Sequence, residues 1–191
     1  MGAAELGRLT VEDFAIHEPH PFADRLRIKS TEADSWLRYF RPKTSVFGEW
    51  ILWDETVELV LWGIKRAKQL GSKLLFVRES GNPLYDDRTP NPQQGFANLW
   101  NRTKKQAGIK GGLPFGSLRD TLPDHLREAY SSEIASMCLT HGTPGVDQLI
   151  NCYSNKPWRA FHDAVRKSHD FYAPLWAAHR SPMDREPARR S

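Results

Sequence analysis

The chain has 191 residues, of which 39% are hydrophobic and 26% charged, and this composition is typical of one soluble globular domain with a sizeable core. Its formal net charge of +4 permits binding to nucleic acid without requiring it. The two cysteines, the lack of a secretory signal and the lack of a membrane-spanning apolar run predict a cytoplasmic protein, with no disulfide scaffold and no membrane partner.

The first thirty residues contain short elements. Leu6 and Leu9 share one helix face, and the alternation of residues 25–28 predicts a short strand. Residues 17–20, His-Glu-Pro-His, raise the question of a metal site. The prolines beside them and the lack of a fourth ligand argue against one, so the sequence predicts no metal site.

A β-hairpin is predicted next, with strands over residues 36–40 and 49–53 and a connection that contains Pro42 and Gly48. Lys43 lies in this connection. A lysine at a hairpin tip can reach into a cleft, and its ammonium can protonate a leaving alkoxide if neighbouring groups lower its pKa. The alternative is an ordinary solvated lysine.

Helical periodicity dominates the middle of the chain. The sequence predicts a helix over residues 55–70, a buried strand over 74–77, a proline-rich loop over 81–92 and a helix over 94–107 with Phe96, Leu99 and Trp100 facing inward. Arg102, Lys104 and Lys105 form the basic outer turn of that last helix. These three cations are candidate contacts to DNA phosphates, and the alternative is that they only confer solubility.

Arg119, His141 and Tyr153 follow in this order, each at the edge of a helical pattern. The forked guanidinium of an arginine can hold a phosphate, a tyrosine can attack phosphorus, and a histidine can donate a hydrogen bond to the developing charge. Ser117 is predicted to cap the helix of Arg119, and Ser131 the helix before His141. The alternatives are an ion pair of Arg119 with Asp120 or another neighbouring acid, and a simple capping role for His141.

The last periodic pattern predicts one amphipathic helix over residues 158–176, with Phe161, Ala164, Val165 and Phe171 facing inward. Residues 178–191 are basic and contain prolines, which predicts a disordered tail after a single domain of residues 1–177. Taken together, the patterns predict an α+β fold that is mainly helical and has a small antiparallel sheet.

Three segments carry a resemblance to a known family. Residues 115–121, Phe-Gly-Ser-Leu-Arg-Asp-Thr, resemble the second arginine box of the tyrosine recombinases, the phage integrase family. Residues 139–142, Leu-Thr-His-Gly, resemble the Leu-Gly-His box of that family, and Tyr153 resembles its nucleophile. The resemblance covers residues 1–177 and concerns the catalytic domain alone.

This resemblance implies a fold, an activity and a set of site residues. It implies a DNA breaking and rejoining enzyme that forms a 3′-phosphotyrosyl intermediate, with Tyr153, Arg119 and His141 as catalytic residues. Lys43-Thr44 resembles the hairpin lysine of the family, which protonates the leaving oxygen. The implied partners are double-stranded DNA and other recombinase subunits on it, and no cofactor is implied.

The sequence departs from the family pattern at two positions. Gly2, three residues before Glu5-Leu6, stands where the family has its first arginine, and Gly116 stands where it has a histidine or lysine. Arg8 points to a different helix face from Gly2 and does not replace that arginine. The chain therefore resembles an N-terminally truncated, partly degenerate catalytic domain with eroded activity. The alternatives are an inactive DNA-binding relic or regulator of the same fold, and a protein-interaction domain.

Overall fold

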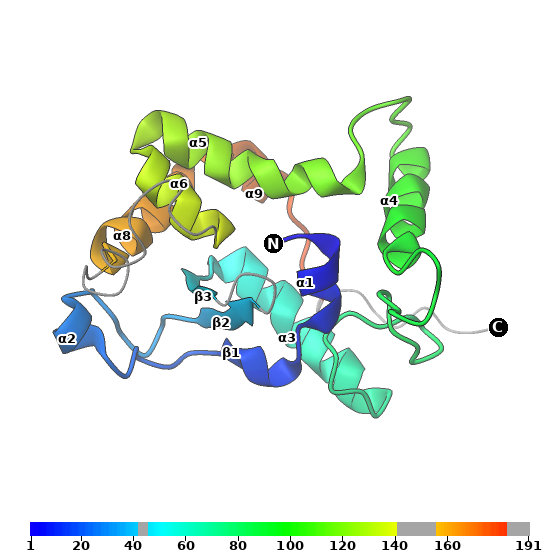
Figure 1. The fold of residues 1–191 in the computed structure, drawn as a ribbon, viewed down its shortest axis with the longest axis horizontal. Helices are drawn as coiled ribbons and strands as arrows, with labels where there is room; N and C mark the ends of the chain where they lie inside the picture. The colour runs from blue at the N-terminus through cyan, green and yellow to red at the C-terminus, as the bar shows by residue number, and fades with distance from the viewer. Residues whose placement is uncertain (42–45, 141–155, 183–191) are drawn as a thin grey trace.

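The computed structural model describes residues 1–41, 46–140 and 156–182. These residues are mainly helical and form one three-stranded antiparallel sheet of order β1-β2-β3 (Figure 1), so the predicted α+β class is confirmed. The elements are α1 (Ala3–Arg8), η1 (Val11–Asp13), β1 (Phe14–Ala15), α2 (Ala23–Leu26), β2 (Trp36–Arg41), β3 (Val46–Ile51), α3 (Asp54–Gln69), α4 (Gln94–Gln106), η2 (Phe115–Asp120), α5 (Thr121–Ala129), α6 (Ser132–Leu139), α8 (Trp158–Ser168), η3 (Asp170–Tyr172) and α9 (Ala173–Ala178).

The predicted hairpin is present as β2 and β3, paired from Trp36↔Ile51 to Arg41↔Val46. The second strand begins earlier than residue 49 and ends at Ile51, because Trp53 leaves the sheet to become the N-cap of α3. The indole N–H of Trp53 donates to the carbonyl of Val165 in α8, at 3.0 Å. The end of the hairpin is thereby attached to the helical layer.

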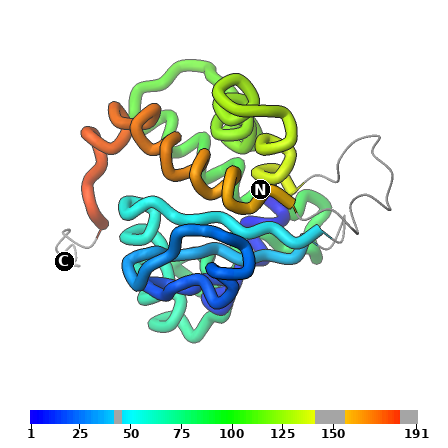
Figure 2. The backbone as a smooth tube through the Cα atoms, turned by 90° about the vertical axis from the view of Figure 1, so that its left-hand side faces the viewer, coloured from blue at the N-terminus to red at the C-terminus, as the bar shows by residue number. Residues whose placement is uncertain are grey.

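Helices α5, α6 and α8 form a layer over the sheet, and α8 lies between the other two helices and the strands in Figure 2. Trp36, Leu126 and Phe161 are completely buried between the two layers, where removal of their apolar surface from water stabilises the fold. Helix α3 lies on the side of the sheet away from α5 and α6 (Figure 1). Helix α4 stands apart from this layer and is joined to η2 by the stacked rings of Phe96 and Phe115, 5.2 Å between centroids.

The two predicted helix caps had different outcomes. Ser131 does cap α6, because its Oγ accepts a hydrogen bond from the N–H of Ile134 at 3.2 Å. Ser117 caps no helix, since it lies inside the 3₁₀ helix η2 and α5 begins only at Thr121. Arg119 therefore lies just before an α-helix instead of at its first turn.

Three other predictions of secondary structure were wrong. The predicted strand over residues 25–28 is absent, because residues 23–26 form the single helical turn α2. Arg27 then has a left-handed backbone (φ 53°), after which Ile28 is buried in the core. Residues 74–77 make only isolated bridges, from Leu74 to Thr10 and from Val77 to Pro83, because no neighbouring strand continues the pairing.

The third error concerns the last helix, which is split into α8, η3 and α9 instead of running through residues 158–176. Pro174 has no backbone N–H to extend a helix that arrives from α8. After this break the side chain of Phe171 is 60% exposed, whereas Phe161, Ala164 and Val165 are buried as predicted.

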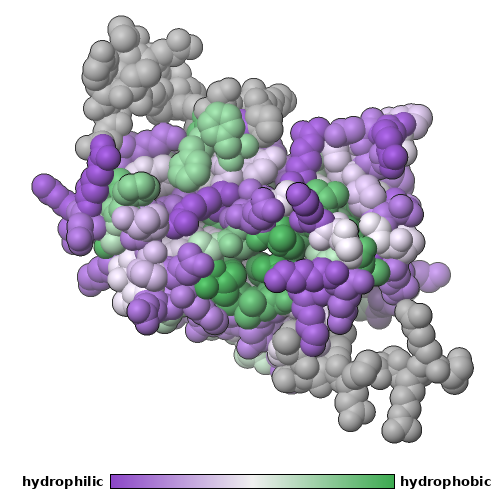
Figure 3. All heavy atoms as spheres, turned by 90° about the horizontal axis from the view of Figure 1, so that it is seen from below, coloured by the Kyte–Doolittle hydropathy of each residue, from purple (hydrophilic) through white to green (hydrophobic). Residues whose placement is uncertain are grey.

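The surface combines polar and apolar areas. On the face seen from below, hydrophobic side chains gather in the middle and polar side chains surround them (Figure 3). Leu99, which was predicted to face inward, is 40% exposed on α4. Among the described residues, no helix has the length and apolar character needed to cross a membrane.

Candidate functional site

Arg119 lies in η2, half-buried, on the wall of a cavity of about 420 Å³. The cavity lies between the start of α1, the end of β3 and the helical layer. Burial raises the pKa of the Cys138 thiol to about 11, and the positive charge of Arg119 acts weakly in the opposite direction. The Arg119 guanidinium is thus close enough to affect the Cys138 thiol. Cys138 lies in the last turn of α6, two residues before Thr140, after which the next described residue is Lys156.

Gly2 and Gly116 line the same cavity as Arg119. A Cβ added to Gly116 would meet nothing within 4 Å, so this position has room for a longer side chain. A Cβ added to Gly2 would lie 3.0 Å from Glu5 Oε2, so a side chain there would require the Glu5 carboxylate to shift. The two residues at which the sequence departs from the recombinase pattern are neighbours of Arg119 in space.

An ion pair fixes the start of α1 against the hairpin. Arg41, the last described residue of β2, places its Nε 2.6 Å from Glu5 Oε1, and the other carboxylate oxygen of Glu5 accepts the N–H of Gly2. Burial alone would raise the pKa of Glu5, but these two interactions outweigh it and lower the pKa below its usual range. Glu5 therefore holds Gly2 next to the strand that leads to Lys43.

The described residues on either side of the gap at 141–155 both pack against β3. Thr140 is buried, and a Cβ on Gly48 would lie only 2.3 Å from its Cγ2, so this contact requires glycine. After the gap, the ring of Trp158 lies 6.2 Å from that of Phe47, edge to face. The segment between Thr140 and Trp158 thus starts and ends beside the first half of β3.

Of the four predicted catalytic residues, the structure places only Arg119. Lys43, His141 and Tyr153 lie outside the described residues, and so does Cys152. Arg119 lies in the 3₁₀ turn before α5 and not in the first turn of that helix, contrary to the helix-cap prediction. Arg8 is directed away from this site, because both of its hydrogen bonds go to the carboxylate of Asp87, at 3.0 and 3.1 Å.

The three predicted DNA-binding residues lie on the last turns of α4, outside the cavity lining. Arg102 and Lys105 are exposed. Lys104 is half-buried, since its Nζ donates to the carbonyl of Gly111 at 3.3 Å and lies 5.9 Å from the ring centre of Trp100. Arg102 and Lys105 are therefore better placed than Lys104 to contact an anionic partner.

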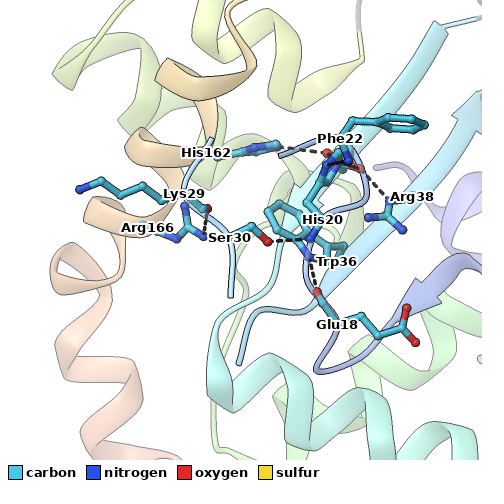
Figure 4. A network of polar contacts seen from close by, with 10 residues as sticks. Glu18, His20, Phe22, Lys29, Ser30, Trp36, Arg38, His162 and Arg166 are labelled. Carbon is cyan, nitrogen blue, oxygen red and sulfur yellow. Dashed lines mark hydrogen bonds and ion pairs between the residues drawn. The ribbon is translucent and has the colours of Figure 1, made fainter. Parts of the chain in front are cut away.

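A buried polar network was not predicted from the sequence (Figure 4). The carboxylate of Glu49 accepts from Arg38 Nε at 2.7 Å and lies 2.8 Å from His20 Nε2. The N–H of Phe22 donates to His20 Nδ1, which leaves Nε2 as the ring nitrogen that faces the Glu49 carboxylate. A charged residue at position 49 within a run of apolar strand residues is the signal that would have revealed this network.

His162 of α8 belongs to the same network and is completely buried, with its Nε2 3.6 Å from Glu49 Oε1. Burial lowers the pKa of His162 to about 4, and the nearby Glu49 carboxylate only partly opposes this. The ring of Trp36 packs edge to face against both histidines, 5.0 Å from His20 and 5.1 Å from His162. Within residues 1–41, 46–140 and 156–182, no group of three His, Cys, Asp or Glu side chains is arranged to hold a metal ion.

The comparisons with known proteins add no relative. No family model, no curated protein and no solved structure matches this chain. A function can therefore be argued only from the residues and their geometry.

Proposed function

We propose that this chain is a DNA-binding domain of the tyrosine recombinase type, which breaks and rejoins DNA strands through Tyr153. One observation carries the proposal: Gly2, Gly116 and Arg119 line one cavity although the two glycines are far apart in the sequence. The resemblance assigns these three positions to a single phosphate cage. The sequence boxes alone do not require such positions to meet, so their convergence supports the proposal.

The hairpin provides further support. Arg41, the described residue that precedes the Lys43 loop, is connected through Glu5 to Gly2 at the cavity. Thr140, the residue before His141, packs on Gly48 of the same hairpin. The Lys43 loop thus follows a strand that is connected to Gly2, and the residue before His141 packs on the other strand of the same hairpin.

The proposed reaction is a phosphoryl transfer without a metal or nucleotide cofactor. The Tyr153 Oη gives its proton to water and attacks the scissile phosphorus, a P–O bond to tyrosine forms, and the bond from phosphorus to the 5′-oxygen breaks. Arg119 and His141 donate hydrogen bonds to the charge on the pentavalent phosphorus, and Lys43 gives a proton to the departing 5′-oxygen. Attack of a 5′-hydroxyl on the phosphotyrosine reverses these steps and rejoins a strand.

Specific observations favour a second candidate, DNA binding without cleavage. Gly2 and Gly116 contribute no side-chain donor to the cavity, and Arg119 is the one charged side chain among its described lining residues. Loss of a single transition-state donor lowers turnover by roughly 10²–10³-fold. Two missing donors leave a protein that can hold a phosphate with little ability to transfer it.

A nicked suicide substrate separates the two candidates, because the short 5′ fragment diffuses away and traps any covalent complex. We expect a weak protein–DNA adduct on a denaturing gel, lost in Tyr153→Phe and retained in the matched control Tyr130→Phe. Gly116→His should increase the adduct, since position 116 has open space for the ring. If Gly116→His also gives no adduct at high protein concentration and low salt, the cleavage proposal is wrong. Retention on DNA would then support the second candidate.

A further inference from the structure

The cavity beside Arg119 is large enough for a small organic molecule. Its volume is about 420 Å³. A cavity of about 150 Å³ in another protein holds one benzene molecule. The space next to Arg119 therefore has room for two or three fused rings together with a polar substituent.

The walls of this cavity are mainly apolar and are held in place by hydrogen bonds. Trp50 donates its indole N–H to the carbonyl of Cys138 at 3.1 Å, and Trp53 donates to that of Val165 at 3.0 Å, so both indoles are fixed before any ligand arrives. Leu37 and Leu122 are among the further apolar residues that line the cavity. A preformed wall of this kind reduces the entropy that binding would cost.

The charge of the lining selects the kind of ligand. Arg119 is the one charged side chain among the described lining residues, and no Asp or Glu is among them. The only other ionisable side chain in that lining, the thiol of Cys138, stays neutral near pH 7 because burial raises its pKa to about 11. Met1 also lines the cavity, and burial lowers the pKa of its amino group. The fixed charge of the lining is therefore the positive charge of Arg119, and the carboxylate of an apolar molecule can accept two parallel hydrogen bonds from the guanidinium fork.

We infer that this cavity binds an aromatic carboxylate of two or three rings, with its carboxylate on Arg119 and its rings against Trp50 and Trp53. If Arg119 also holds a DNA phosphate, as the proposed function states, the carboxylate competes with DNA for the same guanidinium. Bound ligand then releases the protein from DNA. Binding of the carboxylate itself does not depend on the proposed function, but its effect on DNA does.

The test titrates the full chain with 2-naphthoate and with its uncharged isostere 2-naphthamide in a calorimeter. We expect 2-naphthoate to bind at least tenfold more tightly than the amide. Arg119→Gln should remove this difference, and the matched control Arg88→Gln, on an exposed loop outside the cavity lining, should retain it. Equal affinities of acid and amide in the natural chain, or no heat from either at millimolar concentration, would overturn the inference.

A second variant tests the inference independently, in case Arg119→Gln does not fold. Gly116→Phe adds a ring to a residue that lines the cavity, at a position where a Cβ meets nothing within 4 Å, and should abolish 2-naphthoate binding while the thermal midpoint stays unchanged. If folded Gly116→Phe binds 2-naphthoate as tightly as the natural chain, the ligand binds elsewhere and the inference is wrong. In a final arm, 2-naphthoate should displace a DNA duplex at fixed ionic strength. If the carboxylate binds but the chain never retains DNA, the proposed function fails and the ligand site stands.

Discussion

Glu5 and Arg41 form an ion pair of 2.6 Å across 36 positions of sequence, and this pair attaches the first helix to the last described residue of β2. The two side chains are only 14% and 10% exposed. Removing one partner of such a pair leaves a charge in a poorly solvated place. The pair therefore determines where Gly2 and the hairpin end lie relative to one another.

Replacing Glu5 tests the strength of this attachment. Glu5→Ala should lower the free energy of unfolding by about 3 kcal/mol, because Arg41 keeps its charge and loses its buried partner. The matched control is Asp87→Ala, which removes the exposed partner of Arg8 and should leave the urea midpoint nearly unchanged. Equal midpoint shifts in the two variants would mean that the Glu5–Arg41 pair is no more than a surface contact.

His162 should make the stability of the protein depend on pH. Its pKa falls from 6.5 to about 4 on burial, so the unfolded chain binds a proton between these values while the folded chain does not. Stability should therefore fall as the pH drops from 6.5 toward 4, by roughly 3 kcal/mol in all, and change little from this residue above pH 7. Urea unfolding at a series of pH values measures the slope.

Two substitutions identify His162 as the source of that slope. The groups that face it are Glu49, His20 and Arg166. His162→Phe keeps an aromatic ring against Trp36 and removes the titrating group, so it should flatten the dependence between pH 4 and 6.5. His17→Asn changes an exposed histidine and should not. An unchanged slope in His162→Phe would assign the effect to another residue.

Gly48 should tolerate no side chain. A Cβ there would lie 2.3 Å from Thr140 and 2.4 Å from Trp50, so Gly48→Ala should cost about 1–3 kcal/mol through overpacking. Gly116→Ala is the matched control, because its Cβ meets nothing within 4 Å. Thermal unfolding of both variants gives the comparison, and a Gly48→Ala protein as stable as the control would show that Thr140 does not pack on β3.

Arg102 and Lys105 should contribute to DNA affinity through phosphate charge alone. Arg102→Gln and Lys105→Gln should each weaken binding to any duplex and reduce the slope of log affinity against log salt by about 1. Lys104→Gln should have a smaller effect, because Lys104 already donates to Gly111. Fluorescence anisotropy titrations between 50 and 200 mM salt, a range wide enough for such slopes, measure all three. A larger loss in Lys104→Gln than in the other two would contradict this assignment.

Arg119→Lys separates a forked phosphate contact from a simple positive charge. Lysine keeps the charge and lacks the planar fork, so DNA affinity should fall by at least fivefold while the thermal midpoint is retained. Filter binding at fixed salt measures the affinity. If the affinity is unchanged, Arg119 has a structural role, and the phosphate cage must be abandoned.

The sequence alone was sufficient to predict helices, strands and caps whose physical cause lies within a few neighbouring residues. The pattern of apolar residues predicted the hairpin of β2 and β3 and the helices α3 and α4 to within a few residues. Ser131 was recognised as a cap because a serine hydroxyl satisfies an N–H within the same turn. The splitting of the last helix was also readable in principle, since Pro174 cannot continue α8 whatever surrounds it.

Only the tertiary structure decided which distant residues meet, because such contacts depend on how the layers pack and leave no periodic signal. The sequence ranked Arg119 as a candidate, but packing brought Gly2 and Gly116 to the same cavity and gave it apolar walls. Packing likewise buried Glu49 between His20, Arg38 and His162, four residues from separate parts of the chain. Local patterns determine the elements, and burial across long sequence separations determines which of their side chains can act together.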